Sequence, residues 1–369
     1  MALALRENLI PQPANNTLSL VGAIEGFYGK SWSWEDRFSY AYHLREMGLG
    51  CYIYAPKGDP FLRKRWREEW PEQEWLELLK LSSQYRYRHI NWGLGISPYA
   101  LYTDYSNQQK RLLKAKVRRL NDLNPDVLAV LFDDMPGDMP DLAARQYEIV
   151  SDICQETDAS RVIVCPTYYS FDPVLEQIFG KMPENYLRQL GRLLPQDIDI
   201  FWTGNKVCSA SINSDDLSQI SDSFGRLPVL WDNYPVNDGR AGCNFLNLRS
   251  LPERNIKLGS DINGHLCNPM SQANLSLIPL SSLACLHNTE RSQNEFLLSQ
   301  ALDRYAGTIT AALLEKDISA FQELGLLEFD DEQRELLMKR YSNVPGACAA
   351  EICSWLRGDY TFDPECLTG

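Results

Sequence analysis

Short apolar runs alternate with longer amphipathic stretches from residue 18 to about residue 288. The apolar runs have the length and composition of buried strands, and they cover residues 18–24, 50–55, 90–96, 126–132, 161–165, 198–202, 228–231 and 256–263. The stretches between and after them predict helices over residues 34–48, 71–88, 107–123, 140–157, 184–194, 213–224, a short piece at 247–253, and 271–288. Eight strand–helix repeats favour an α/β fold of the (β/α)8 TIM-barrel type. A doubly wound open sheet is the alternative, because a strand count alone does not establish closure.

The strand pattern stops after residue 290. Residues 291–323 and 330–342 are predicted to be helical, and the tail from residue 343 is predicted to be less regular because it contains Pro345, Gly346 and Gly358. We therefore divide the chain into a catalytic barrel over residues 18–290 and a small helical C-terminal region over residues 291–369. Nothing in the C-terminal region indicates catalysis.

Charge and composition narrow the class of ligand. The formal net charge of −13 argues against nucleic acid or an anionic membrane as partner, because phosphate binding needs a basic face. The N-terminus lacks a basic region followed by an apolar run, and no apolar run of about 18 residues occurs, so neither a signal peptide nor a membrane span is expected. Ten scattered cysteines without a Cys-x-x-Cys motif suit a cytoplasmic protein with reduced thiols.

Two other motifs do not fit their usual functions. Gly29-Lys30-Ser31 resembles the end of a phosphate-binding loop, but Ile24 stands where that loop requires a glycine. The histidines are isolated, with none four residues from another: His43, His89, His265 and His287. We interpret them as structural, and we expect neither a metal nor a cofactor.

Asp133 and Asp134 follow the apolar run at residues 126–132 directly. Chemistry in α/β folds is placed at the carboxyl ends of strands, which is where these two acids stand. Two adjacent carboxylates cannot both ionise without a penalty, so their pKa values should separate into one acid and one base.

Polar residues also follow most of the other predicted strands. They lie at residues 25–29, 54–57, 166–169, 202–204, 231–238 and 268. In a closed barrel these positions converge on one pocket. The set contains carboxylates, amides, one ammonium group and tryptophans, and it contains no thiol–imidazole pair and no serine–histidine pair. It is typical of a site that binds a neutral, hydroxyl-rich ligand such as a sugar.

The segments 21–29, 52–57, 131–134 and 231–238 resemble the O-GlcNAcase family, which is glycoside hydrolase family 84, the retaining β-N-acetylglucosaminidases. Residues 165–167, 201–206 and 268–269 fall in the same register, so the resemblance covers the whole predicted barrel. It implies substrate-assisted catalysis, in which the 2-acetamido oxygen of the substrate attacks the anomeric carbon and forms an oxazoline. Asp133 would orient the acetamido N–H, and Asp134 would act first as general acid and then as general base.

The resemblance also implies the ligands of the sugar. Tyr169 would hydrogen-bond the acetamido carbonyl, and Trp231 would line the pocket for the acetyl methyl group. The sugar hydroxyls and the catalytic loop would be held by Gly26, Lys57, Asn233, Asp238 and Asn268. Tyr168 replaces an acid that is common in the family, so Tyr168 and Tyr169 are both candidates for the acetamido contact.

We therefore expect an exo-acting β-N-acetylglucosaminidase whose partners are β-linked N-acetylglucosamine conjugates, including O-GlcNAc on protein serine and threonine. Free glycans, chitin or cell-wall fragments are alternative substrates, since the aglycone side is formed mostly by loops. A catalytically silent sugar-binding protein is an alternative of another class. The resemblance carries no expectation for the oligomeric state.

Overall fold

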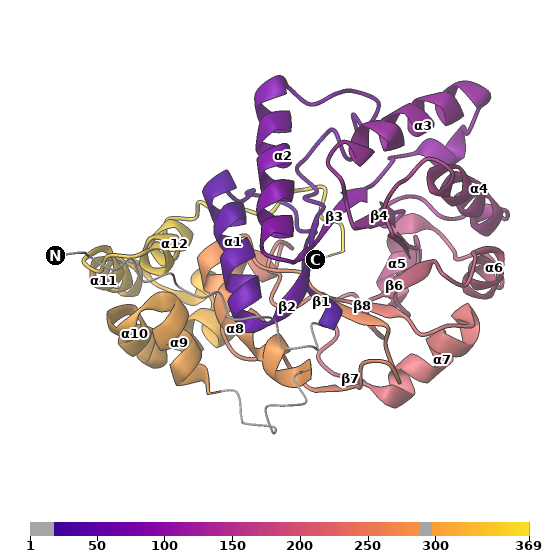
Figure 1. Ribbon diagram of the computed structural model, residues 1–369. Coiled ribbons are helices and arrows are strands. Elements are labelled where there is room, and N and C mark those ends of the chain that lie inside the picture. The colour runs from indigo at the N-terminus through magenta and orange to yellow at the C-terminus, as the bar shows by residue number, and fades with distance from the viewer. Residues whose placement is uncertain (1–17, 288–296, 369) are drawn as a thin grey trace.

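Eight parallel strands close into a barrel at the centre of the molecule (Figure 1). The computed structural model describes residues 18–287 and 297–368. The barrel strands are β1 (Leu18–Glu25), β2 (Leu49–Tyr54), β3 (Asn91–Ile96), β4 (Val127–Leu131), β5 (Arg161–Cys165), β6 (Asp199–Trp202), β8 (Val229–Asp232) and β10 (Gly264–Cys267). Their order around the barrel is β1-β10-β8-β6-β5-β4-β3-β2, so the first and last strands pair and the predicted closure is confirmed. All five residues of β4 are buried, as expected for a strand covered on both faces.

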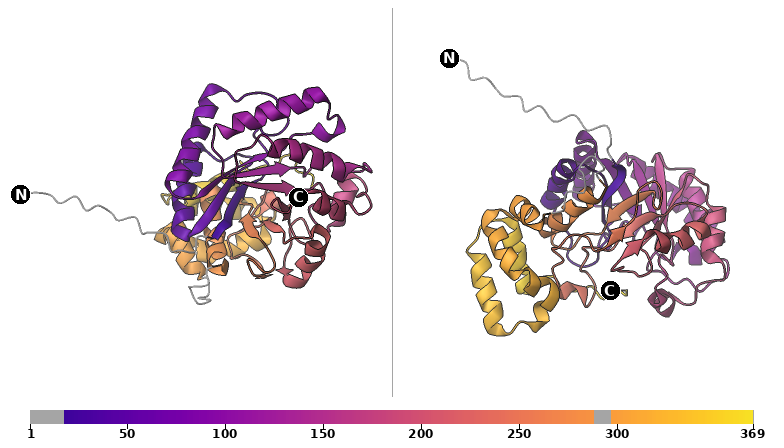
Figure 2. Two further views of the ribbon diagram at one scale, coloured as in Figure 1. Left: turned by 45° about the vertical axis from the view of Figure 1, so that its right-hand side comes forward. Right: turned by 90° about the horizontal axis from the view of Figure 1, so that it is seen from below.

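Helices surround the barrel and cover its outer face (Figures 1 and 2). They are α1 (Trp34–Met47), α2 (Glu72–Tyr87), α3 (Asn107–Asn121), α4 (Leu142–Cys154), α5 (Pro173–Phe179), α6 (Tyr186–Leu193), α7 (Ser214–Phe224) and α8 (Ala273–His287). The local sequence sets their ends. For α1, Ser33 and Asp36 form a capping box, and Gly48 ends the helix with a φ of 81° that favours glycine. Among the described residues, no helix is long and apolar enough to cross a membrane.

The connection between β8 and β10 is irregular, and here two predictions are wrong. The predicted strand at 256–263 contains a tight turn at Gly259, whose φ is 81°, and the barrel strand begins only at Gly264. The predicted helix at 247–253 is a segment without regular secondary structure. It is followed by β9 (Arg254–Asn255), which pairs with β7 (Ile212–Asn213) in a small separate sheet, and the short helix in this connection is η2 (Gly242–Asn244).

Four further helices form a lobe on one side of the barrel (Figure 2). They are α9 (Leu298–Ala306), α10 (Thr308–Ser319), α11 (Asp331–Ser342) and α12 (Ala347–Leu356). Gly307, with a φ of 79°, separates α9 from α10 within the stretch predicted as helical. The expectation of an irregular tail is wrong for α12, because Gly346 and Gly358 flank this helix rather than interrupt it. The proposed boundary at 290/291 lies outside the described residues.

The core of the lobe is continuous with residues from the barrel connections. Phe321 and Trp355 of the lobe pack in one buried cluster with Leu246, Met270 and Leu275. After α12 the chain turns back toward the barrel, and Figure 1 shows this last segment in yellow, ending over the barrel centre. The C-terminal lobe therefore shares a buried cluster with α8 and with the loops next to β10, and it returns the chain to the open end of the barrel.

Candidate active site

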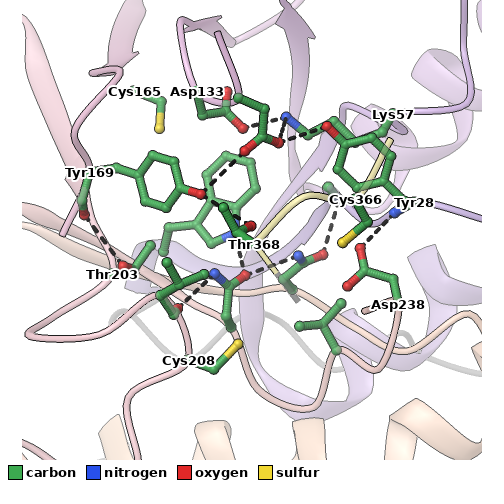
Figure 3. Close-up of a pocket in the computed structure, with 17 residues that line it drawn as sticks. Tyr28, Lys57, Asp133, Cys165, Tyr169, Thr203, Cys208, Asp238, Cys366 and Thr368 are labelled. Atoms are coloured by element: carbon green, nitrogen blue, oxygen red, sulfur yellow. Dashed lines mark hydrogen bonds and ion pairs between the residues drawn. The ribbon is translucent and has the colours of Figure 1, made fainter. Parts of the chain in front are cut away.

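A pocket lies at the carboxyl ends of the barrel strands (Figure 3). All nine residues assigned from the sequence line it: Gly26, Lys57, Asp133, Asp134, Tyr169, Trp231, Asn233, Asp238 and Asn268. They follow or end β1, β2, β4, β5, β8 and β10, so barrel closure brings together residues that are up to 242 positions apart. The pocket holds about 50 Å³ of free volume.

Asp133 and Asp134 form the centre of this pocket. Asp134 has a φ of 57°, a left-handed conformation that is uncommon for residues other than glycine and is tolerated by aspartate. The Tyr28 hydroxyl donates to Asp134 Oδ2 at 2.7 Å, and the Tyr169 hydroxyl donates to Oδ1 at 3.3 Å. Figure 3 shows the two tyrosines on opposite sides of the carboxylates. Burial, followed by the charge of Asp134, raises the pKa of both tyrosines, so both remain donors.

Lys57 places a positive charge against both carboxylates. Its Nζ forms an ion pair with Asp133 Oδ2 and lies 3.6 Å from Asp134 Oδ2. Burial alone would lower the pKa of Lys57, but the two carboxylates outweigh burial and raise it, so the ammonium stays charged. Burial also raises the pKa of Asp133. The charge of Lys57 lowers this pKa and the charge of Asp134 raises it, so that it lies above its usual value.

The two oxygens of Asp133 differ in their surroundings. Oδ2 accepts from Lys57, whereas Oδ1 is buried and has no hydrogen-bond partner among the described residues. An unpaired buried acceptor costs about 1–3 kcal/mol unless a ligand satisfies it. Asp133 therefore presents an acceptor suited to a donor group of a ligand.

A chain of hydrogen bonds fixes the opposite wall of the pocket. Trp231 Nε1 and Asn268 Nδ2 both donate to Asn233 Oδ1, at 3.0 and 3.1 Å, and the Gly26 N–H donates to Asn268 Oδ1 at 3.1 Å. A Cβ atom on Gly26 would lie 2.3 Å from the Trp231 ring, so only glycine allows this close approach. The indole and the two amides are consequently held in fixed orientations.

Asp238 joins two sides of the pocket. Its Oδ2 accepts from the backbone N–H of Tyr28 at 2.7 Å. Burial raises the pKa of Asp238 to about 6, the Tyr28 N–H opposes that rise, and the charge of Asp134 adds to it. This carboxyl group therefore titrates above its usual range.

Geometry separates the two candidate tyrosines. Tyr169 lines the pocket and reaches Asp134. Tyr168 instead donates its hydroxyl to the carbonyl of Gly180 at 2.6 Å, and its ring packs against Tyr186. Tyr169 is therefore the tyrosine placed to contact a ligand.

The pocket also contains residues that sequence reasoning did not assign. They are Tyr28, Cys165, Thr203, Val207, Cys208, Val236, Cys366 and Thr368. Tyr28 and Thr203 lie in segments that the position rule places at the pocket, but the sequence assigned them no role. Cys366 and Thr368 come from the C-terminal segment, where no sequence pattern pointed to the pocket.

A second polar cluster lies next to the wall that Trp231 forms, at the ends of β8 and β10. Asp232, His265 and Cys267 bring potential metal-ligating atoms within 4.8 Å of one another. Arg254, however, donates to both oxygens of Asp232, at 2.7 and 2.8 Å, and His265 lies 3.0 Å from one of them. A metal ion there would face the guanidinium group, so these residues fit a structural network and do not fit a metal centre.

A TIM barrel whose open end carries a carboxylate pair, a lysine and a wall of tryptophan and amides defines the class of glycoside hydrolases. A family model described as beta-N-acetylglucosaminidase matches residues 21–322, and the chain belongs to this family.

Curated relatives agree with this family. The chain is 30% identical over 274 residues to the Protein O-GlcNAcase of Rattus norvegicus and to that of Mus musculus. The match covers 72% of this chain and 29% of each relative, so the chain spans less than a third of their length.

Solved structures show the same architecture. A variant of the Thermobaculum terrenum O-GlcNAc hydrolase aligns with a TM-score of 0.74 and 28% identity, over 92% of this chain and 81% of that one. The protein CpGH84B aligns with a TM-score of 0.72 over 92% of this chain and 66% of its own, and at 22% identity it supports the fold alone.

Proposed function

We propose that this glycoside hydrolase is a retaining exo-β-N-acetylglucosaminidase that uses the acetamido group of its substrate as the nucleophile, and that it removes O-GlcNAc from serine and threonine of proteins. The unpaired Oδ1 of Asp133 is the observation that carries the proposal. A buried acceptor beside a second carboxyl group suits an acetamido N–H, which becomes more acidic as its carbonyl oxygen attacks. The cytoplasmic location remains a prediction from the sequence.

In the first step, the acetamido carbonyl oxygen forms a bond to the anomeric carbon while the glycosidic C–O bond breaks. Asp134 gives its proton to the departing oxygen, and Asp133 accepts the acetamido N–H as positive charge develops on that group. In the second step, Asp134 takes a proton from water as the water opens the oxazoline. Lys57 holds Asp133 in place through their ion pair.

Comparing two aryl glycosides tests the nucleophile. The aryl β-N-acetylglucosaminide and the aryl β-glucoside share a leaving group, but only the first carries the acetamido group. We expect kcat/KM for the first to be higher by at least about a hundredfold, because a well-placed intramolecular nucleophile has a large effective molarity. Progressive fluorination of the acetyl methyl should also lower the rate, since it weakens the carbonyl oxygen as a nucleophile. Equal rates on both glycosides would contradict the proposed mechanism.

The protein substrate needs a separate comparison. A peptide that carries one O-linked N-acetylglucosamine is compared with a chitin disaccharide at equal concentration. We expect a higher kcat/KM on the glycopeptide. A clear preference for the disaccharide would assign the enzyme to free glycans, and binding of N-acetylglucosamine without turnover of either would indicate a sugar-binding protein.

A further inference from the structure

The C-terminal segment, residues 359–368, enters the candidate pocket. Cys366 and Thr368 line it together with the barrel residues, and Figure 3 shows both beside the predicted sugar ligands. The Tyr169 hydroxyl oxygen lies 3.5 Å from Thr368 Oγ1, within hydrogen-bonding distance. The remaining 50 Å³ holds only a few water molecules, since a single water needs about 10–15 Å³ by this measure. The seated segment therefore narrows the space that is left for a sugar with its acetamido group.

Basic side chains from three barrel loops hold the segment. Glu365 pairs with Arg63 at 3.2 Å and also with Lys64, both in the loop after β2. The Arg240 guanidinium lies 4.8 Å from the centre of the Phe362 ring, and Lys30 Nζ lies 4.4 Å from that of Tyr360. An acidic residue and two aromatic residues of the segment thus each meet a cation from a loop at the carboxyl end of the barrel.

These holding contacts are of a kind that can open. The side chains of Glu365 and Lys64 are 43% and 50% exposed, and exposed ion pairs contribute little to stability. The segment also forms a local turn, in which the Cys366 N–H donates to the Asp363 carbonyl at 2.9 Å. Release therefore leaves this turn intact, exposes the buried Cys366, and breaks side-chain contacts that include the Arg63–Glu365 pair and the Tyr169–Thr368 contact.

We propose that residues 359–368 occupy, as an intramolecular ligand, the part of the cleft that receives the polypeptide of a glycoprotein substrate. The four cations Lys30, Arg63, Lys64 and Arg240, defined here as the basic rim, then select substrates with acidic and aromatic residues beside the glycosylated serine or threonine. This inference rests on the proposed function for its substrate. Substrate then binds only to molecules whose segment is released. The apparent Kd of the substrate is therefore the intrinsic Kd divided by the fraction of molecules in this open state.

The first test loosens the segment within the full chain. Glu365→Ala removes the acid that meets Arg63 and Lys64, and Glu335→Ala, an exposed acid on α11, is the matched control. We expect Glu365→Ala to lower the Kd of N-acetylglucosamine, read by tryptophan fluorescence, and the KM for an O-GlcNAc peptide by roughly two- to fivefold, the range for an exposed ion pair. The kcat should stay unchanged. Unchanged Kd and KM would overturn the inference. A lowered kcat would overturn it as well, because the segment would then be a part of the active site that catalysis requires.

The second test supplies the segment from outside. A synthetic peptide of residues 359–368 is expected to inhibit Glu365→Ala competitively against the glycopeptide, and to inhibit the wild type less because its own segment competes. Lys64→Glu should weaken this inhibition, since it reverses a charge of the basic rim. A peptide that fails to compete, or that competes equally with and without Lys64, would overturn the inference.

The substrate preference gives the final readout. Glycopeptides with acidic and aromatic flanking residues are expected to show a higher kcat/KM than lysine-flanked ones, and the reverse order would contradict a basic peptide subsite. Two fluorescence readouts, the Kd of N-acetylglucosamine and its displacement by the peptide, need no turnover. If they respond as expected while no N-acetylglucosaminide is hydrolysed, the proposed function fails and the occupancy of the cleft stands. If hydrolysis is normal and Glu365→Ala changes nothing, only the inference fails.

Discussion

The backbone of Asp134 turns the chain sharply where β4 ends, with a φ of 57°. This turn lets two adjacent aspartates face the same pocket, although neighbouring residues in a strand point to opposite sides. Asp133 then meets Lys57, and Asp134 meets Tyr28 and Tyr169. The different partners give two identical side chains different environments, which is the usual physical basis for different acid–base roles.

Replacing each aspartate separately tests these roles. Asp134→Asn removes the general acid and should lower kcat/KM on a glycoside with a poor leaving group by about 10²–10⁴-fold. The loss should be much smaller for a nitrophenyl glycoside, whose leaving group departs without a proton. Asp133→Asn should lower kcat/KM on both, because orientation of the acetamido group is needed for either. Asp138→Asn, an exposed acid in the same loop, is the control. Equal sensitivity of the two variants to the leaving group would show that the roles are misassigned.

Asp238 gives the protein a pH-dependent stability. Burial raises its pKa from 3.8 to about 6 in the folded state. Between these values the folded chain binds more protons than the unfolded chain, so the contribution of Asp238 to the free energy of unfolding falls as pH rises from about 4 to about 6. Two pKa units correspond to at most about 3 kcal/mol, and the partial exposure of the side chain reduces this.

Urea unfolding at pH 4, 5, 6 and 7 measures this effect. Asp238→Asn keeps an acceptor for the Tyr28 N–H but has no charge to bury. Its free energy of unfolding should therefore rise relative to the wild type as the pH increases, by about 1–3 kcal/mol at pH 7. Asp138→Asn should show no such trend. A difference that is constant with pH would mean that Asp238 has an ordinary pKa.

At the scale of elements, local signals explain which predictions held. The seven barrel strands before β10 and most barrel helices follow from apolar runs and amphipathic stretches with clear turn residues between them. The last strand is predicted at the wrong place because the apolar Ile256 and Ile262 have the spacing of a buried strand. In the structure both are buried, but they lie on the two sides of the turn at Gly259. Helix α5 was missed despite a usable signal, an Asp172 cap followed by Pro173.

One contact between elements joins the lobe to the barrel. Glu351 of α12 accepts from the backbone N–H groups of Asn274 and Leu275, both at 2.9 Å, and from the Asn274 side chain at 2.8 Å. Those two N–H groups belong to the first turn of α8 and have no partner within that helix. A carboxylate at this position also interacts favourably with the helix dipole. Glu351 is thus a cap supplied by a residue more than seventy positions away.

Removing this cap should destabilise the protein. Glu351→Ala leaves two backbone N–H groups of α8 without their acceptor, which costs about 1–3 kcal/mol of the free energy of unfolding. Glu351→Gln should lose less, because one acceptor remains. Glu335→Ala, on the exposed side of α11, should stay within about 0.5 kcal/mol of the wild type. Chemical denaturation of the four proteins decides the matter, and an equal stability of Glu351→Ala and the control would contradict the capping role.

At the scale of the whole molecule, the candidate site combines residues that follow barrel strands with residues that the C-terminal segment brings to it. The nine assigned residues follow barrel strands, so position in the chain and barrel closure were enough to gather them. Cys366 and Thr368 reach the same pocket only because the lobe carries the chain back to the barrel's open end. That path depends on how α9 to α12 pack on the barrel, and no local pattern encodes it.

The buried cluster that joins the lobe to α8 and to the connection between β8 and β10 predicts that barrel and lobe unfold together. Phe321 is fully buried, its ring lies 5.5 Å from that of Trp355, and its carbonyl accepts from the Leu246 N–H at 3.1 Å. Phe321→Ala should lower the free energy of unfolding by about 3–5 kcal/mol. Since Leu246 belongs to the connection between β8 and β10, the loss should reach the barrel. Circular dichroism, tryptophan fluorescence and glycosidase activity should then give coincident transitions that shift together. Leu327→Ala, at a side chain that is 75% exposed, should shift none of them. Activity that outlasts the loss of helical signal would show instead that the barrel folds independently of the lobe.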